Sequence, residues 1–319
     1  MGSAEYGTGC WIHEYITPWD FYAHGVASVL AYRKTAFQEM YIVETESYGK
    51  ALVLDGKWQS CVGDEFLYHE PLVHPAMLLH GAPRRVLILG GGEGATAREV
   101  LRWNTVEQAV MIDIDGEVVD ACREHLQEMH NGAFDDPRLE VVIEDALGYL
   151  EDVSKPWDVI ISDLSDPIED GPSFKLFTKE YFEKAKNALA PDGAFVLQAG
   201  PVAPNEMGMH ARLATTMSAV FDHVRSYVSY VPTYASPWAF TLGSAKPIDA
   251  TPDVDQIDRR LKDQTKGGLR MFDGTTLLGM LQLPAHLRRA IADETRVYTL
   301  NEPPKFFGKS TVAPSGTTA

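Results

Sequence analysis

The chain has 319 residues, of which 45% are hydrophobic and 10% are aromatic. This length and composition exclude wholesale disorder and suit one large α/β domain with a smaller one beside it. The formal charge is −17, from 45 acidic and 28 basic residues. Such a surface repels phosphates, so we expect no nucleic acid or membrane partner, whereas cationic small molecules are attracted. Solubility alone is the plainer explanation of the charge.

Cysteines and apolar runs are sparse. Cys10, Cys61 and Cys122 are too few and too scattered for a disulfide framework or a zinc site. The N-terminus lacks the basic and apolar regions of a secretion signal. No apolar run reaches the roughly 20 residues that span a bilayer. The sequence therefore predicts a soluble cytoplasmic protein without a metal.

Residues 1–80 predict a small β-rich domain. Runs of strand-forming residues lie at 38–45, 50–55 and 57–62. The Asp55-Gly56 pair between the last two runs is typical of a hairpin turn. Helical spacing begins near Glu65 and continues to about His80.

Residues 81–246 predict a Rossmann-like catalytic domain. Its expected strands lie at 85–89, 108–112, 139–143, 157–162 and 194–198, and helical patterns lie between them at 95–102 and 118–128. Apolar strands that alternate with helices indicate a doubly wound, mostly parallel sheet covered on both faces.

Residues 247–319 predict a helical extension with a disordered tail. Candidate helices span 255–263 and 277–292. The tail after Lys309 is rich in Ser, Thr, Pro and Gly, which is typical of disorder at a terminus.

A glycine-rich turn, Gly90-Gly91-Gly92-Glu93-Gly94, follows the first of these strands and precedes a helix. Such a turn lets a nucleotide-type ligand approach the backbone closely. The carboxylate of Glu93 would repel a pyrophosphate seated there. The turn therefore disfavours NAD and FAD and favours a ligand without phosphate.

Carboxylates follow the next three strands at the same edge of the sheet, namely Asp113, Asp145, Asp163 and Asp166. Asp113 stands about 20 residues after the glycine turn, where an acid commonly binds ribose hydroxyls. Each acid alone could be a helix cap or a solvated loop residue. Together they favour a cationic ligand that carries a ribose, such as a sulfonium nucleoside, with an amine nearby.

Asp163 and Asp166 lie three residues apart on one loop. An amine must lose its proton before it can accept an alkyl group, and its pKa is near 10. One carboxylate could accept that proton while the other holds a second ammonium group. We expect Asp163 to be the base and Asp166 the anchor. A capped turn before a helix at 179–188 would explain the same two residues without a function.

These motifs resemble the spermidine and spermine synthase family of polyamine aminopropyltransferases along nearly the whole chain. The family's signatures stand here as Val53-Leu54-Asp55-Gly56, Asp64-Glu65 with Tyr68-His69-Glu70, His74-Pro75, the Gly90–Gly94 turn and Asp163-Leu164-Ser165-Asp166-Pro167. The resemblance implies a small N-terminal β domain, a Rossmann-like catalytic domain, and assembly through the N-terminal strands into homodimers or homotetramers.

Within the family, three segments look like the thermospermine synthases, namely 163–176, 198–201 and 293–298. Spermidine synthases typically carry Gln-Gly-Glu at 198–200 and Gln in place of His69. Agmatine-using bacterial relatives share His69 and the Glu93 turn, so they remain the close competitor.

The resemblance also implies the site residues and the reaction. It places the donor, decarboxylated S-adenosylmethionine, among Gln38, Gln59, His69, Glu93, Asp113, Asp145 and Ala146. It places Asp163 with Gln59 at the reacting centre, and it places the acceptor among Tyr68, Asp166, Gln198 and Tyr234, with Trp238 as a further candidate. No cofactor or metal is implied beyond this co-substrate.

The expected reaction transfers an aminopropyl group to spermidine and gives thermospermine and methylthioadenosine. Putrescine or agmatine could replace spermidine as the acceptor. A methyltransferase, a nicotinamide-dependent oxidoreductase and a non-catalytic polyamine-binding protein are the competing hypotheses for the function of the chain.

Overall fold

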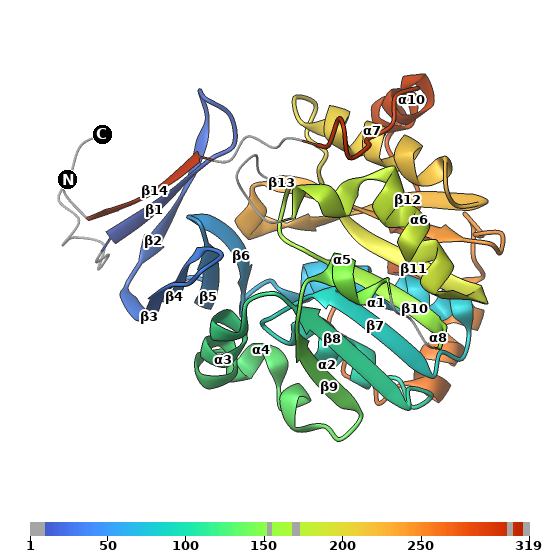
Figure 1. Ribbon diagram of the computed structural model, residues 1–319, viewed down its shortest axis with the longest axis horizontal. Helices are drawn as coiled ribbons and strands as arrows, with labels where there is room; N and C mark the ends of the chain where they lie inside the picture. Colours follow the sequence, from blue (N-terminus) through green and yellow to red (C-terminus); the bar gives the residue numbers. More distant parts are fainter. Residues whose placement is uncertain (1–9, 152–154, 168–172, 305–308, 315–319) are drawn as a thin grey trace.

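The computed structural model describes residues 10–151, 155–167, 173–304 and 309–314. Figure 1 shows two small antiparallel sheets on one side of the molecule and a larger α/β domain on the other. The predicted combination of a small N-terminal β domain with a Rossmann-like domain is confirmed. The division of the chain at residues 80 and 246 stays a prediction.

One small sheet has the order β3-β4-β5-β6. Its strands are β3 (Ser28–Lys34), β4 (Glu39–Thr45), β5 (Gly49–Leu54) and β6 (Lys57–Cys61). The predicted hairpin between β5 and β6 is confirmed. Asp55 and Gly56 both have a positive φ, 49° and 73°, as a two-residue turn that follows the twist of its strands requires.

The other small sheet has the order β14-β1-β2 and corrects one prediction. Its strands are β1 (Cys10–Tyr15), β2 (Phe21–Val26) and β14 (Lys309–Pro314). The tail after Lys309, expected to be disordered, forms β14 and pairs antiparallel with β1 along its whole length. The prediction from the composition of the tail was wrong because a strand at the edge of a sheet pairs through its backbone N–H and C=O groups. This pairing does not depend on apolar side chains. Residues 315–319 lie outside the described residues.

The large sheet has the order β12-β13-β11-β10-β7-β8-β9. Its strands are β7 (Arg85–Gly90), β8 (Gln108–Asp113), β9 (Leu139–Ile143), β10 (Trp157–Asp163), β11 (Leu189–Pro201), β12 (His223–Val231) and β13 (Ser236–Ser244). The five adjacent strands β11, β10, β7, β8 and β9 are parallel to one another, and β13 runs antiparallel to both β11 and β12. The carboxyl ends of the parallel strands therefore meet at one edge.

Helices surround this sheet (Figure 1). The α-helices are α1 (Phe66–His80), α2 (Ala95–Leu101), α3 (Gly116–His125), α4 (Gln127–His130), α5 (Ala146–Tyr149), α6 (Lys179–Ala188), α7 (Met207–Ser218), α8 (Val254–Gln264), α9 (Gly274–Met280) and α10 (Ala285–Asp293); short 3₁₀ turns are η2 (Ala133–Asp135), η3 (Phe174–Phe177) and η4 (Pro232–Tyr234). The single helix expected over 277–292 is two helices. Pro284 separates them because a proline disfavours helical backbone in the residue before it.

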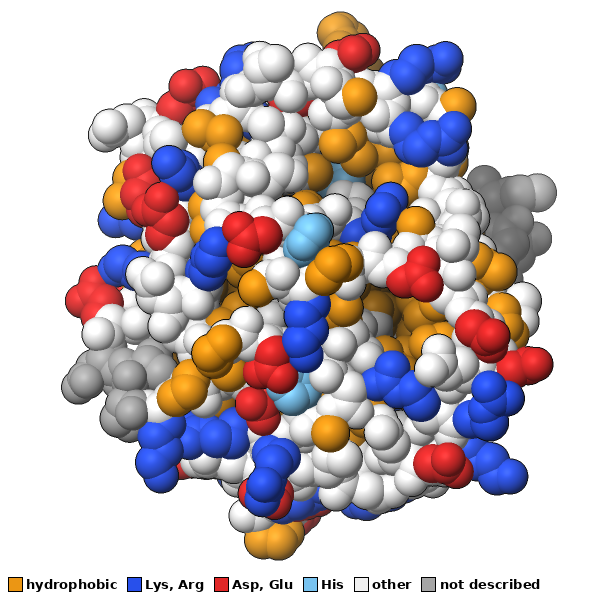
Figure 2. All heavy atoms as spheres, turned by 90° about the vertical axis from the view of Figure 1, so that its right-hand side faces the viewer, with side chains coloured by type: hydrophobic (Ala, Val, Ile, Leu, Met, Phe, Trp, Pro, Cys, Tyr) orange, Lys and Arg blue, Asp and Glu red, His pale blue; other side chains and the backbone are white. Residues whose placement is uncertain are grey.

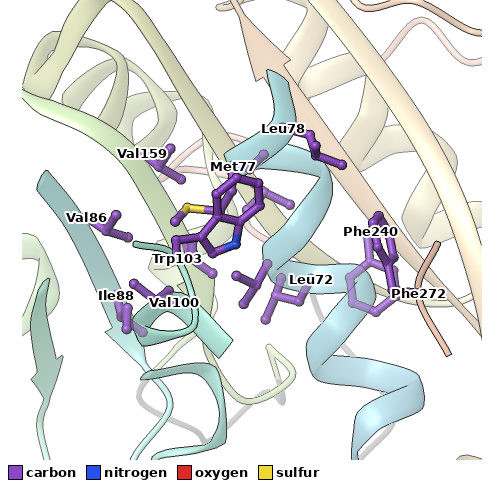
Figure 3. Packing of buried hydrophobic residues seen from close by; sticks show 14 of the residues in the cluster. Leu72, Met77, Leu78, Val86, Ile88, Val100, Trp103, Val159, Phe240 and Phe272 are labelled. Carbon is purple, nitrogen blue, oxygen red and sulfur yellow. The ribbon is translucent and has the colours of Figure 1, made fainter. Parts of the chain in front are cut away.

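Helix α1 is the centre of the core and is buried from Tyr68 to Leu78. Figure 3 shows the Trp103 ring packed among side chains of α1, α2 and the sheet. The indole nitrogen of Trp103 donates to Nδ1 of His74 at 3.2 Å, and Nε2 of His74 meets Oε2 of Glu99 at 3.1 Å. These polar groups are buried with partners, as a close-packed interior requires.

The surface opposite the small sheets carries acidic and basic side chains interspersed with apolar ones (Figure 2). In the part of the chain that the structure describes, no helix is long and apolar enough to cross a membrane.

Glu70 provides the first test because it joins α1 to the C-terminal region. Its fully buried carboxylate accepts the backbone N–H groups of Arg270, Met271 and Phe272 at 2.6 to 2.9 Å. Each buried donor left without a partner costs about 1–3 kcal/mol. We predict that Glu70→Ala lowers the free energy of unfolding by about 3 kcal/mol or more, measured by urea denaturation.

Glu107→Ala is the matched control because this exposed side chain pairs with exposed Arg84, and such pairs contribute about 0–1 kcal/mol. An equal, small loss in both variants would show that Glu70 does not hold these segments together.

Candidate active site

One cavity lies at the carboxyl edge of the parallel strands and is closed from the other side by residues of β1, β5 and β6. All the predicted site residues except His69 line it. They are Gln38, Gln59, Tyr68, Glu93, Asp113, Asp145, Ala146, Asp163, Asp166, Gln198 and Tyr234, and Trp238 lines it as well. Residues far apart in the sequence converge on one cavity because they follow neighbouring strands.

The glycine turn is needed because β7 and β10 end in close contact. Gly90 pairs with Asp163 across the two strands, and a Cβ at Gly90 would lie 2.1 Å from the carbonyl oxygen of Asp163. At Gly92 a Cβ would lie 2.7 Å from Oδ2 of Asp113. Gly90 also has a φ of 82°, which favours glycine. The turn therefore brings the ends of three strands together.

Asp163 is a buried carboxylate with two hydroxyl donors. Tyr68 donates to Oδ1 at 2.8 Å and Thr96 donates to Oδ2 at 2.6 Å. Burial, with the nearby charge of Glu93, raises the pKa of Asp163 to about 6, although His69 and the two hydroxyls oppose the rise. A carboxylate with a pKa near neutrality is suited to accept a proton at physiological pH.

On the side away from the cavity, Glu93 contacts a buried series of charged residues, namely His69, Glu65 and Arg98. Nε2 of His69 meets Oε1 of Glu93 at 2.8 Å, while Nδ1 meets both the carbonyl oxygen and Oε2 of Glu65 at 2.8 and 2.9 Å. Because both ring nitrogens face acceptors, the imidazolium form satisfies all of these contacts. Arg98 in turn donates to both carboxylate oxygens of Glu65 at 3.1 and 2.8 Å.

His69 itself is fully buried and does not reach the cavity. Burial lowers the pKa of His69, but its hydrogen bonds to Glu65 and Glu93 outweigh that effect and raise it to about 10. In the structure His69 contacts Glu93, which lines the cavity, and a contact of His69 with the donor stays a prediction.

Asp113 and Gln38 both contact Asp115 at the start of α3. Burial raises the pKa of Asp113 to about 7, against a hydrogen bond from the Asp115 amide at 2.9 Å. Asp115 caps α3 and accepts from Nε2 of Gln38 at 3.1 Å. Asp145 caps α5 through the Leu147 amide at 3.0 Å, so it is a helix cap as well as a residue that lines the cavity.

The other end of the cavity is lined by Asp166, Gln198, Tyr234 and Trp238. Nε2 of Gln198 donates to Oδ1 of Asp166 at 3.2 Å, and Oε1 of Gln198 accepts from the Trp238 indole at 3.1 Å. Burial raises the pKa of Asp166 to about 6, although Lys57 and Gln198 oppose the rise. The rings of Tyr234 and Trp238 pack edge to face, with centroids 4.7 Å apart.

Four further residues were missed in the sequence, namely Glu14, Lys57, Thr96 and Glu206. Thr96 holds Asp163 from α2, and the other three line the end of the cavity near Asp166. Glu14 and Lys57 lie within strands of the small sheets. Only the packing of these sheets against the large domain reveals them, so no local sequence pattern could have found them.

Comparison with known proteins identifies the family. Residues 65–252 match the spermine/spermidine synthase domain, and residues 10–61 match the spermidine synthase tetramerisation domain. The chain belongs to this family. The predicted membership of the polyamine aminopropyltransferases, which are transferases, is confirmed. The second match agrees with the predicted homo-oligomer.

Relatives match over most of their length. A polyamine aminopropyltransferase of Synechococcus sp. (strain JA-2-3B'a(2-13)) is 58% identical over 92% of this chain and 97% of its own. Thermospermine synthase ACAULIS5 of Arabidopsis thaliana is 39% identical over 88% of this chain and 82% of its own. A crystal structure of spermidine synthase in complex with the transition state analogue AdoDATO matches with a TM-score of 0.82 and 31% identity, over 88% of this chain and 94% of that one.

The His69 contacts predict a dependence of stability on pH. The pKa of His69 is about 10 in the folded protein and 6.5 in the unfolded chain. A raised pKa stabilises the fold fully below pH 6.5, and this contribution is lost as the pH rises towards 10. We predict that His69→Gln costs a few kcal/mol at pH 6.5 and much less at pH 9.5, at about 1.4 kcal/mol per unit of pKa shift.

Urea unfolding of both proteins at the two pH values measures this difference. The contributions of other titrating groups cancel when the free energies of unfolding of wild type and variant are subtracted at each pH. A cost of His69→Gln that stays the same at both pH values would contradict a protonated His69.

Proposed function

We propose that the protein transfers the aminopropyl group of decarboxylated S-adenosylmethionine to spermidine, giving thermospermine and methylthioadenosine. The observation that carries this proposal is the pair Asp163 and Asp166, which line the same cavity as the glycine turn and the carboxylates of Glu93 and Asp113. Such a cavity suits a cationic nucleoside at one end and a polyamine at the other.

The donor lies over the glycine turn. Asp113 binds the ribose hydroxyls, Asp145 and Ala146 border the base, and Gln38 and Gln59 close the cavity from the small sheet. Glu93, held by His69 at 2.8 Å, attracts the donor's positive charge. Because the donor lacks the carboxylate of S-adenosylmethionine, an acidic site does not repel it, whereas a methyltransferase would need a group to meet that carboxylate.

The acceptor amine approaches beside Asp163. Asp163 takes a proton from the terminal amine, whose nitrogen then attacks the aminopropyl carbon bonded to sulfur. The new N–C bond forms as the C–S bond breaks, and the electron pair goes to sulfur, which leaves as methylthioadenosine. Tyr68 orients Asp163, and Asp166 with Gln198 holds a remaining ammonium group of the acceptor at the end of the cavity that Tyr234 and Trp238 line. The chain's contribution is orientation and electrostatics.

Spermidine is the proposed acceptor for two reasons. Segments 163–176 and 198–201 resemble the thermospermine synthases, and ACAULIS5 is among the relatives. Residues 168–172 of the first segment lie outside the described residues. We also propose that the protein acts in the cytoplasm as a homodimer or homotetramer, assembled through residues 10–61.

A product assay tests the proposal. Purified protein is incubated with decarboxylated S-adenosylmethionine and, separately, spermidine, putrescine or agmatine, and products are separated by chromatography against thermospermine and spermine standards. We predict thermospermine from spermidine, with methylthioadenosine in equal amount. Product from putrescine or agmatine alone would support aminopropyl transfer but refute spermidine as the acceptor. Polyamine binding without methylthioadenosine would instead identify a non-catalytic binding protein.

A further inference from the structure

Asp64 is a buried carboxylate in the turn between β6 and α1, and it lies outside the cavity. It is only 3% exposed and is not among the residues that line the cavity. Oδ2 of Asp64 accepts the backbone N–H of Thr233 at 2.9 Å. Oδ1 accepts the hydroxyl of Thr233 at 3.1 Å and the thiol of Cys61 at 2.9 Å. Asp64 therefore joins the start of α1 to a segment far along the chain.

Thr233 is the central residue of η4, the turn between β12 and β13. It is fully buried. Ala235, directly after the turn, has a φ of 56°, which lies in the left-handed region that residues other than glycine rarely adopt. Such a backbone conformation persists only where surrounding contacts hold it. The two hydrogen bonds from Thr233 to Asp64 are contacts of this kind.

Tyr234 follows Thr233 in η4 and is fixed at its hydroxyl as well. The hydroxyl donates to the carbonyl oxygen of Gln59. Gln59 is the extra residue of a β-bulge between β5 and β6, and a bulge leaves this residue unpaired in the ladder. Burial, with nearby charges that include Asp64, raises the pKa of Tyr234 well above its usual range. The hydroxyl therefore stays protonated and remains a donor.

The ring of Tyr234 lies next to the residue that binds the proposed base. It packs edge to face against the ring of Tyr68, with centroids 5.9 Å apart, and Tyr68 donates to Asp163. Tyr68 and Tyr234 both line the cavity. A shift of η4 would therefore move the cavity wall beside the proposed acceptor, whereas the glycine turn after β7 would keep its own contacts.

We propose that Asp64 is a positioning residue for the acceptor, which fixes η4 and thereby holds the ring of Tyr234 against Tyr68 at the cavity. This inference rests on the proposed function, which places the acceptor beside these two rings. It gives the buried Asp64 a role in acceptor binding without any contact with the acceptor.

Asp64→Ala tests this inference because it removes both hydrogen bonds to Thr233. We predict that KM for spermidine rises at least about tenfold. We expect kcat, and the Kd of decarboxylated S-adenosylmethionine measured by calorimetry, to stay within about threefold of wild type. Asp64→Asn can still accept the Thr233 amide, so its KM should rise less than about threefold. A folded Asp64→Ala protein with the wild-type KM would overturn the inference.

Glu70→Ala is the control for a loss of stability alone. Glu70 is also a buried carboxylate that joins α1 to a distant segment, but neither Glu70 nor residues 270–272, which it holds, line the cavity. We predict that its KM for spermidine stays within about threefold of wild type at a temperature where the variant is folded. A purely structural role of Asp64 predicts the same result for Asp64→Ala.

Thr233→Val and Thr233→Ser provide a second measurement that leaves Asp64 in place. Valine has nearly the shape of threonine but no hydroxyl, so Thr233→Val keeps the hydrogen bond of the amide and loses that of the hydroxyl. We predict that KM for spermidine rises at least about threefold in Thr233→Val and stays within about twofold of wild type in Thr233→Ser. Equal KM values in these two variants would overturn the inference.

Wild-type protein assayed in parallel separates a failure of this inference from a failure of the proposed function. If wild type turns over only putrescine or agmatine, the proposed acceptor fails, and the KM of the acceptor that is used then decides the role of Asp64. If wild type turns over spermidine and the variants keep its KM, only the role of Asp64 fails.

Discussion

The close contact between the ends of β7 and β10 is the constraint on which the site depends. Gly90 and Asp163 are paired across these strands, and no side chain fits between them. The backbone of the glycine turn therefore lies directly beside the carboxylate that we propose as the base. A donor seated on the turn is within reach of an amine beside Asp163 without any large movement of the chain. Proximity of this kind is a major source of catalytic rate.

Burying several carboxylates in one cavity is energetically unfavourable, and buried hydrogen-bond donors next to the cavity offset this cost. Arg98, Glu65 and His69 form a buried chain that ends at Glu93, and two hydroxyls donate to Asp163. These donors keep the carboxylates in place, and burial keeps the pKa values of Asp163 and Asp166 raised to about 6. The cavity is thus prepared for cations, which supply the missing counter-charge when they bind.

Much of the site could be predicted because it follows from local pattern. The strands before Gly90, Asp113 and Asp163 are short apolar runs, and the order of a doubly wound sheet brings their ends together. What could not be predicted depends on contacts between distant segments. Strand β14 exists because β1 offers an unpaired edge, and Glu14 and Lys57 reach the cavity only because the small sheets pack over it. The resemblance placed His69 at the donor, but its burial between Glu65 and Glu93 follows only from contacts between distant segments.

Catalysis by Asp163 is the central claim, and Asp163→Asn tests it most directly. Asparagine has nearly the same shape, but it cannot accept the amine's proton. We predict that turnover falls by about 10²–10⁴-fold, while decarboxylated S-adenosylmethionine still binds by calorimetry with a Kd within about threefold of wild type. Asp120→Asn, at an exposed position on α3, is the control and leaves both unchanged. Full turnover in Asp163→Asn would contradict the role of Asp163 as the base.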